Sequence, residues 1–112
     1  MFCFQCQETA KNQGCTVKGV CGKENSTSDL QDLLIHNLKG IGAIAHAARE
    51  NGAAIPNEVG IFVNQALFTT ITNANFNDDN VVEWISQAQK VKKELYDAVK
   101  DKVSGDLPAA AA

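Results

Sequence analysis

All four cysteines of this 112-residue chain lie within its first 21 positions, and no cysteine follows them. They are spaced C-x2-C-x8-C-x5-C and are Cys3, Cys6, Cys15 and Cys21. A secretory leader would need a basic n-region and an apolar h-region, and the chain begins with neither. Thiols gathered in such a chain are more often metal ligands or redox groups than structural disulfides. The amino-terminal segment is therefore the first place to look for chemistry.

Composition narrows the class of protein. A hydrophobic fraction of 45% and a charged fraction of 21% are ordinary for one small globular domain. The net charge of -3 and the pI near 5.2 leave no basic stripe, so we expect no nucleic-acid partner. No stretch approaches the roughly 18 consecutive apolar residues of a membrane span, so we expect a cytoplasmic protein without a membrane partner.

Three kinds of chemistry compete for the four cysteines. An iron-sulfur cluster is favoured, because a C-x2-C turn can aim two sulfurs at neighbouring irons, and Gly14, Gly19 and Gly22 would let the backbone approach the cluster or adopt a positive φ. A structural zinc site usually has two short knuckles, so the x5 spacing of the second pair suits it less well. Disulfides or a dithiol redox pair are the third alternative, and the absence of a predicted strand before Cys3 weakens a thioredoxin-like site.

Local charge supports a site for thiolates. Residues 1–25 contain Lys11, Lys18 and Lys23 against Glu8 and Glu24, which gives this segment a charge of +1 while the remainder carries -4. Positive charge near a thiol favours its thiolate form and offsets an anionic cluster.

The rest of the chain is predicted to be all-α. Residues 1–25 are loop-like, and apolar residues recur at helical spacing over 29–51, 58–72 and a third stretch that begins after Asn77 and continues toward Gly105 and Pro108. Ser28 and Gln31 form a capping-box pattern that predicts the first helix start, and Gly52 predicts its end. We therefore expect an irregular Cys-rich segment (1–25) followed by an antiparallel three-helix bundle (26–112).

Two glycines and two apolar faces refine this prediction. Gly40 and Gly42 inside the first helix are compatible with a tight helix crossing. The second helix should place its apolar residues on one broad face, and so should the third. The predicted faces are Val59, Phe62, Val63, Ala66, Leu67 and Ile71 for the second helix and Val81, Val82, Ile85, Ala88, Val91, Leu95 and Val99 for the third.

The amino-terminal segment MFCFQCQETAKNQGCTVKGVCGK resembles the start of the hybrid-cluster proteins, also called prismane proteins or hydroxylamine reductases. The stretches LQDLLI (Leu30 to Ile35) and LFTTITNANF (Leu67 to Phe76) share the resemblance, which extends over nearly the whole chain. It implies that Cys3, Cys6, Cys15 and Cys21 hold a cubane [4Fe-4S] cluster. Family branches with wider cysteine spacing carry a [2Fe-2S] cluster instead.

The resemblance also implies what lies elsewhere. Family members are several times longer, and their catalytic hybrid cluster is held by residues of later domains. This chain would then be the beginning of the helical first domain and would be inactive alone as an enzyme. It would pass electrons through its cluster to the remainder of the parent reductase, after accepting them from a donor protein. The alternative is a stand-alone metal-binding helical module, with zinc or a structural cluster and no redox role.

Other residues are better explained by structure than by chemistry. His36 and His46 are ten positions apart on one predicted helix, about 15 Å along its axis, which is too far to share an ion. Capping and solvation explain the carboxylate pairs Asp78 with Asp79 and Asp97 with Asp101. Trp84 with Tyr96 could relay electrons, although aromatic packing is commoner. Phe2 and Phe4 could cover a cluster, and an uncovered apolar face of the bundle could support a homo-oligomer.

Overall fold

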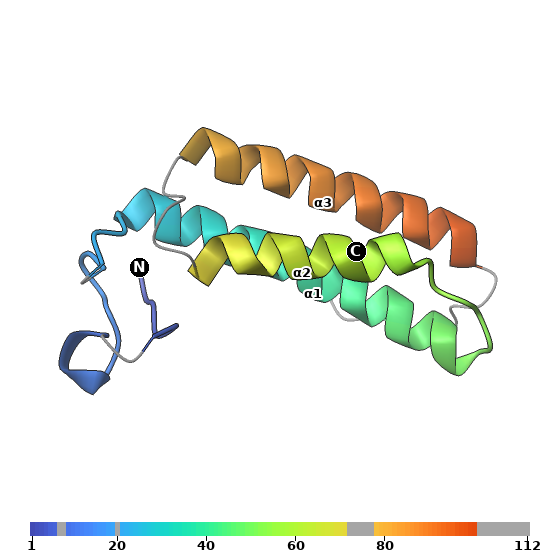
Figure 1. Ribbon diagram of the computed structural model, residues 1–112, viewed down its shortest axis with the longest axis horizontal. Helices are drawn as coiled ribbons and strands as arrows, with labels where there is room; N and C mark the ends of the chain where they lie inside the picture. The colour runs from blue at the N-terminus through green and yellow to red at the C-terminus, as the bar shows by residue number, and fades with distance from the viewer. Residues whose placement is uncertain (7–8, 20, 72–77, 101–112) are drawn as a thin grey trace.

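The computed structural model describes residues 1–6, 9–19, 21–71 and 78–100. A short 3-10 turn, η1 (Ala10–Asn12), precedes three helices: α1 (Asn25–Glu50), α2 (Asn57–Ile71) and α3 (Asp78–Val99). Figure 1 shows that α2 runs against both α1 and α3, so successive helices are antiparallel. The described residues contain no strand beyond one isolated bridge, which confirms the all-α three-helix prediction.

The start of α1 differs from the predicted one. The helix begins at Asn25, four residues before the predicted start at Asp29. Its N-cap is Glu24, whose side chain makes no capping hydrogen bond. Ser28 and Gln31 lie buried inside the helix, and neither polar atom of the Gln31 amide has a hydrogen-bond partner within the described part of the chain. The capping-box prediction was therefore wrong. The first turn is held instead by Ser26 and Thr27, whose hydroxyls both donate to the Asp78 carboxylate at the start of α3.

The end of α1 follows the prediction. Gly52 has φ of +88°, and its N–H donates to the carbonyl of Arg49 at 3.0 Å. The N–H of Ala53 donates to the carbonyl of Ala48, also at 3.0 Å. These two bonds form a Schellman motif, which requires a left-handed residue directly after the helix.

The apolar core lies mainly between α1 and α3. Its buried residues are Leu34, Leu38, Ile41, Ile44 and Ala48 of α1, Ala66 of α2, and Val81, Ile85, Ala88, Leu95 and Val99 of α3. Val82, which was predicted on the same face of α3, is 47% exposed. Gly40 is buried, whereas a Cβ on Gly42 would meet nothing within 4 Å, so no tight crossing occurs at Gly42.

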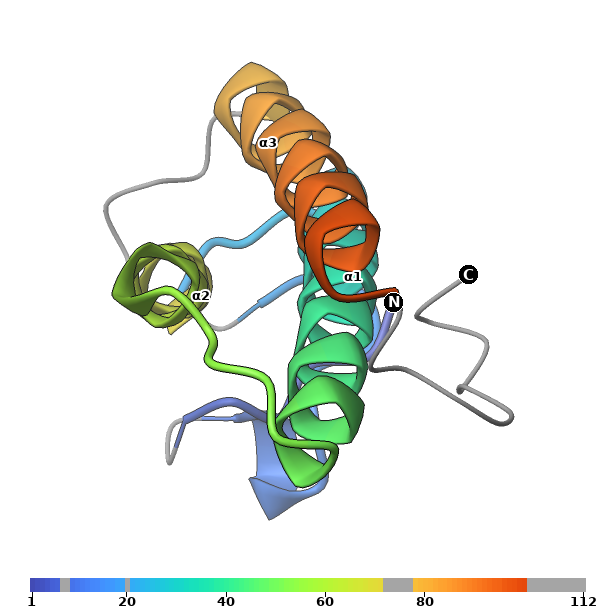
Figure 2. The same ribbon diagram turned by 90° about the vertical axis from the view of Figure 1, so that its right-hand side faces the viewer.

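α2 packs less closely than predicted. Its buried residues are Ala66 and Thr70, while Val59, Phe62 and Val63 are half-buried against the core. Leu67 and Ile71, which were predicted on the buried face, are 39% and 59% exposed. Figure 2 shows the reason, since α2 stands to one side of the closely packed pair α1 and α3.

Several predictions fall outside the described residues. These are the N-cap at Asn77, the carboxylate of Asp101 and the stops at Gly105 and Pro108. None of the described helices is both long enough and apolar enough to cross a membrane.

Candidate metal centre

The backbone first brings Cys3 and Cys15 together. The N–H of Cys3 donates to the Cys15 carbonyl at 2.9 Å, and the N–H of Cys15 donates to the Cys3 carbonyl at 2.8 Å. The hydroxyl of buried Thr9 also donates to the Cys3 carbonyl, at 3.0 Å. This antiparallel pair joins the C-x2-C element to the third cysteine.

Glycine conformation makes this pairing possible. Gly14, directly before Cys15, has φ of +124°, and a Cβ there would lie 2.2 Å from the Phe2 ring. Gly22, directly after Cys21, has φ of +98° with open space around it. The prediction that glycines supply positive φ is confirmed at both positions. The glycines were also expected to let the backbone approach a cluster. The neighbours of Gly14 and Gly19 in the structure are instead the Phe2 ring and Lys23, respectively.

The four thiols are unequally placed, and none is in a disulfide. Cys3, Cys6 and Cys21 line one pocket of about 40 Å³, together with Gln5, Lys23, Thr70 and Ile71. Cys15 is absent from that lining. Its buried sulfur accepts a hydrogen bond from the Ala10 N–H at 3.4 Å and lies 3.6 Å from the Thr9 hydroxyl.

These thiols fit an iron-sulfur cluster or zinc in donor type. Thiolate is the usual ligand of both, and a backbone N–H bonded to sulfur is typical of cluster sites. Across the described residues, however, no three Cys, His, Asp or Glu side chains are close enough to hold a metal ion. A pocket of about 40 Å³ has room for little more than water. Ligand binding would thus have to draw the sulfurs together, as metal binding commonly does.

Lys23 brings positive charge to the pocket. Its side chain is buried, and its Nζ lies 2.8 Å from Gln5 Oε1 and 3.6 Å from Cys3 Sγ. Lys18 pairs instead with Glu24 at 3.0 Å, and Lys11 is exposed. The sequence predicted a basic segment but could not choose among its three lysines.

Two polar residues of this site were missed by sequence analysis. Gln5 Nε2 donates to the Thr70 hydroxyl at 3.1 Å, and Lys23 Nζ also reaches the Thr70 carbonyl at 3.5 Å. Gln5 and Thr70 are 65 positions apart. No local pattern signals such a contact, because it depends on where the end of α2 lies relative to the amino-terminal segment.

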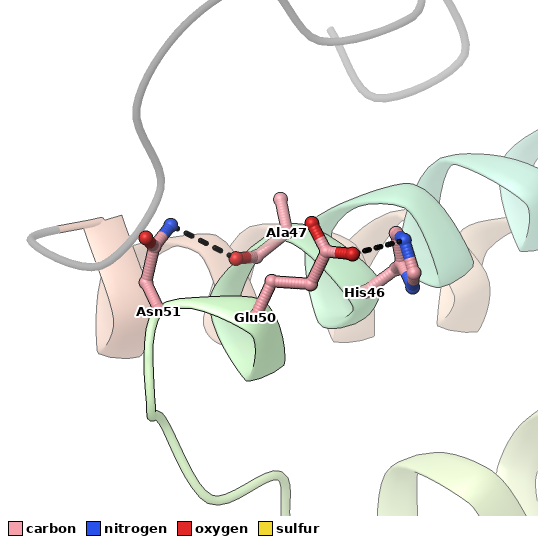
Figure 3. Close-up of polar contacts among 4 residues, drawn as sticks. All are labelled: His46, Ala47, Glu50 and Asn51. Carbon is pink, nitrogen blue, oxygen red and sulfur yellow. Dashed lines mark hydrogen bonds and ion pairs between the residues drawn. The ribbon is translucent and has the colours of Figure 1, made fainter.

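The histidines stay apart from the thiols. Both are exposed, and His46 Nε2 lies 3.2 Å from Glu50 Oε1 one helical turn later (Figure 3). Asn51 caps the same region by donating to the Ala47 carbonyl at 3.0 Å (Figure 3). Within the described part of the chain, neither His36 nor His46 belongs to a group of three or more side chains that could hold a metal ion.

The carboxylates also have structural roles. Hydrogen bonds from Thr27 and then from Ser26 lower the pKa of Asp78 below its usual value, in spite of a small opposing effect of burial. These bonds tie the beginnings of α1 and α3 together. Asp79 and Asp97 are exposed.

Trp84 takes part in aromatic packing, as favoured above, whereas the burial expected of Phe2 and Phe4 needs correction. Trp84 packs against Phe62, with ring centroids 5.6 Å apart, and Tyr96 is 42% exposed. Phe2 and Phe4 are 58% and 52% exposed, so they do not form a buried cover over the thiols. Both line a pocket of about 240 Å³ that also includes Cys3, Lys23 and residues from the first turns of α1.

Comparison with known proteins identifies the family of the chain. The model of the Prismane/CO dehydrogenase family matches residues 1–110. The chain belongs to this family. It is 52% identical over 108 residues to a hydroxylamine reductase of Desulfosudis oleivorans, and the match covers 96% of this chain and 20% of that protein. The resemblance drawn from the cysteine segment is therefore confirmed.

Other relatives in the family agree. The hydroxylamine reductase of Halothermothrix orenii is 51% identical over 91% of this chain, and that of Desulfovibrio desulfuricans is 49% identical over 91%. These matches cover 18% and 19% of the two relatives. The chain thus spans about one fifth of the length of the curated relatives it matches.

Proposed function

We propose that this chain is the amino-terminal iron-sulfur module of a hydroxylamine reductase, in which Cys3, Cys6, Cys15 and Cys21 hold one [4Fe-4S] cluster. One observation carries the proposal: three of these thiols line a common pocket beside a buried ammonium group. About half of the chain's residues are identical to those of proteins named hydroxylamine reductase. When bound, the cluster would supply one-electron transfer.

The chain's own residues would prepare the thiols for this role. The paired backbones of Cys3 and Cys15 keep two distant parts of the sequence adjacent. The Ala10 N–H bonded to Cys15 Sγ and the Lys23 ammonium 3.6 Å from Cys3 Sγ place hydrogen-bond donors at two of the four sulfurs, where ligated thiolates would accept them.

The activity of the whole protein belongs to a longer chain. Hydroxylamine reduction in this family would need the hybrid cluster of later domains, and all four cysteines present here are committed to the first cluster. We therefore propose that electrons enter from a donor protein in the cytoplasm and leave toward the remainder of the parent reductase. The isolated chain should not reduce hydroxylamine.

Anaerobic reconstitution tests the proposal. The purified chain is supplied with iron and sulfide, and bound iron, sulfide and zinc are then counted together with a visible absorption spectrum. We expect iron and sulfide in equal amounts and a loss of both in Cys15→Ala, while the neighbouring control Thr16→Ala loads fully. Stoichiometric zinc without sulfide would support the structural-zinc module instead, and full loading of Cys15→Ala would exclude the four-cysteine ligand set.

A further inference from the structure

Lys23 is the only charged side chain among the buried residues that the structure describes. An ammonium group removed from water needs hydrogen-bond acceptors and negative charge nearby, or its burial is costly. The surroundings of Lys23 Nζ show how each need is met.

The three N–H donors of the ammonium have three acceptors. These are Gln5 Oε1 at 2.8 Å, the Thr70 carbonyl at 3.5 Å and Cys3 Sγ at 3.6 Å. The Thr70 carbonyl lies in the last turn of α2, where helix carbonyls have no partner in the helix and the helix dipole favours a cation. Gln5 reinforces the contact through its bond to the Thr70 hydroxyl. Lys23 therefore fastens the thiol segment to the carboxyl end of α2.

Among the described residues, no carboxylate forms an ion pair with Lys23. The lysine of this segment that does pair with a carboxylate is Lys18, which lies 3.0 Å from Glu24. The Lys23 ammonium instead faces the pocket that Cys3, Cys6 and Cys21 line. Ligated thiolates around an anionic cluster would provide negative charge there.

We propose that Lys23 is the positioning residue of this centre: it docks the thiol segment on α2 and supplies a fixed positive charge that favours the reduced cluster. The docking role stands on the contacts alone, whereas the redox role rests on the proposed function. A reduced cluster carries one more negative charge than an oxidised one, so a nearby cation stabilises it preferentially.

Lys23→Met removes both the charge and the donors, Lys23→Gln removes the charge but keeps two N–H donors on a shorter side chain, and Lys23→Arg keeps the charge. Lys18→Met is the matched control, because Lys18 lies in the same segment but pairs with an exposed glutamate. Lys23 lies outside the apolar core, so each variant should keep the helical circular dichroism of the parent.

Two measurements follow on the full chain. In metal-free protein, Lys23→Met should speed amide exchange at Cys3 and Cys15 by about tenfold or more, because bonds to a charged donor are lost, while Lys18→Met leaves it nearly unchanged. In reconstituted protein held at the parent midpoint potential, the ratio of reduced to oxidised cluster should fall about tenfold in Lys23→Met and Lys23→Gln but not in Lys23→Arg.

The outcomes separate the two proposals. If the parent chain binds no cluster, the proposed function fails, and the exchange data still decide the docking role. If the cluster forms and the Lys23 variants match Lys18→Met in both measurements, the inference is overturned. A fall in the redox ratio for Lys23→Arg equal to that for Lys23→Met would overturn the charge role. Loss of helical structure in both Lys23→Met and Lys23→Gln would assign Lys23 to the fold instead.

Discussion

Gly14→Ala should loosen the pairing of Cys3 with Cys15 through backbone strain rather than through steric overlap. The φ of +124° at Gly14 is a conformation that alanine rarely adopts, at a cost of about 1 to 3 kcal/mol. The new Cβ would also lie 2.2 Å from the Phe2 ring. That ring is 58% exposed, however, and can turn into solvent for roughly 0.5 to 1.5 kcal/mol or less. The strain is therefore the larger effect.

Amide hydrogen exchange resolved by NMR measures this directly. Exchange at Cys3 and Cys15 should quicken by about fivefold to 100-fold in Gly14→Ala, since each 1.4 kcal/mol is about tenfold. A double-mutant cycle with Phe2→Ala separates the two causes. Gly14→Ala with Phe2→Ala should exchange nearly as fast as Gly14→Ala alone. Restoration of the parent rate by Phe2→Ala would mean that overlap dominates, and unchanged exchange in Gly14→Ala would refute the described conformation of the loop.

Three further predictions concern the helices. Gly42→Ala should raise the free energy of unfolding in urea by about 0.8 to 1 kcal/mol, because the position is an exposed helix interior with no atom in the way. Because hydrogen bonds from Thr27 and Ser26 lower the pKa of Asp78, their stabilising effect is fully present above the usual pKa of 3.8 and is lost as the pH falls through the lowered value. Urea unfolding at a series of pH values should thus show a smaller acid loss in Asp78→Asn than in the parent, and equal losses would contradict the linkage. Phe68 is 63% exposed on α2, so Phe68→Ser should weaken any self-association seen by analytical ultracentrifugation, and unaltered association would exclude this face as the contact.

Helix positions were predictable because they depend on local periodicity. The predicted starts of all three helices and the predicted ends of α1 and α2 differ from the observed ones by at most four residues. The capping box at Ser28 failed because Ser26 and Thr27 bond to Asp78, a contact across more than 50 positions that fixes an earlier helical turn. A tertiary bond of this kind overrides a local signal.

Burial was harder to predict than helicity. Periodicity identifies an apolar face but not whether a neighbour covers it, and the exposed Leu67 and Ile71 show the difference. For the site, spacing identified all four cysteines as candidates, and the structure groups three of them around one pocket. The choice of Lys23 among three lysines, and the roles of Gln5 and Thr70, depend on the docking of α2, which no local pattern signals.

X-ray absorption of the anaerobically reconstituted chain at the iron and zinc edges tests most directly whether the four cysteines bind one iron-sulfur centre. We predict iron coordinated by sulfur alone, with a second shell of neighbouring iron atoms. Both shells should disappear in each of the single variants Cys3→Ala, Cys6→Ala, Cys15→Ala and Cys21→Ala. An iron environment without neighbouring iron, or sulfur-coordinated zinc in place of iron, would contradict the cluster assignment.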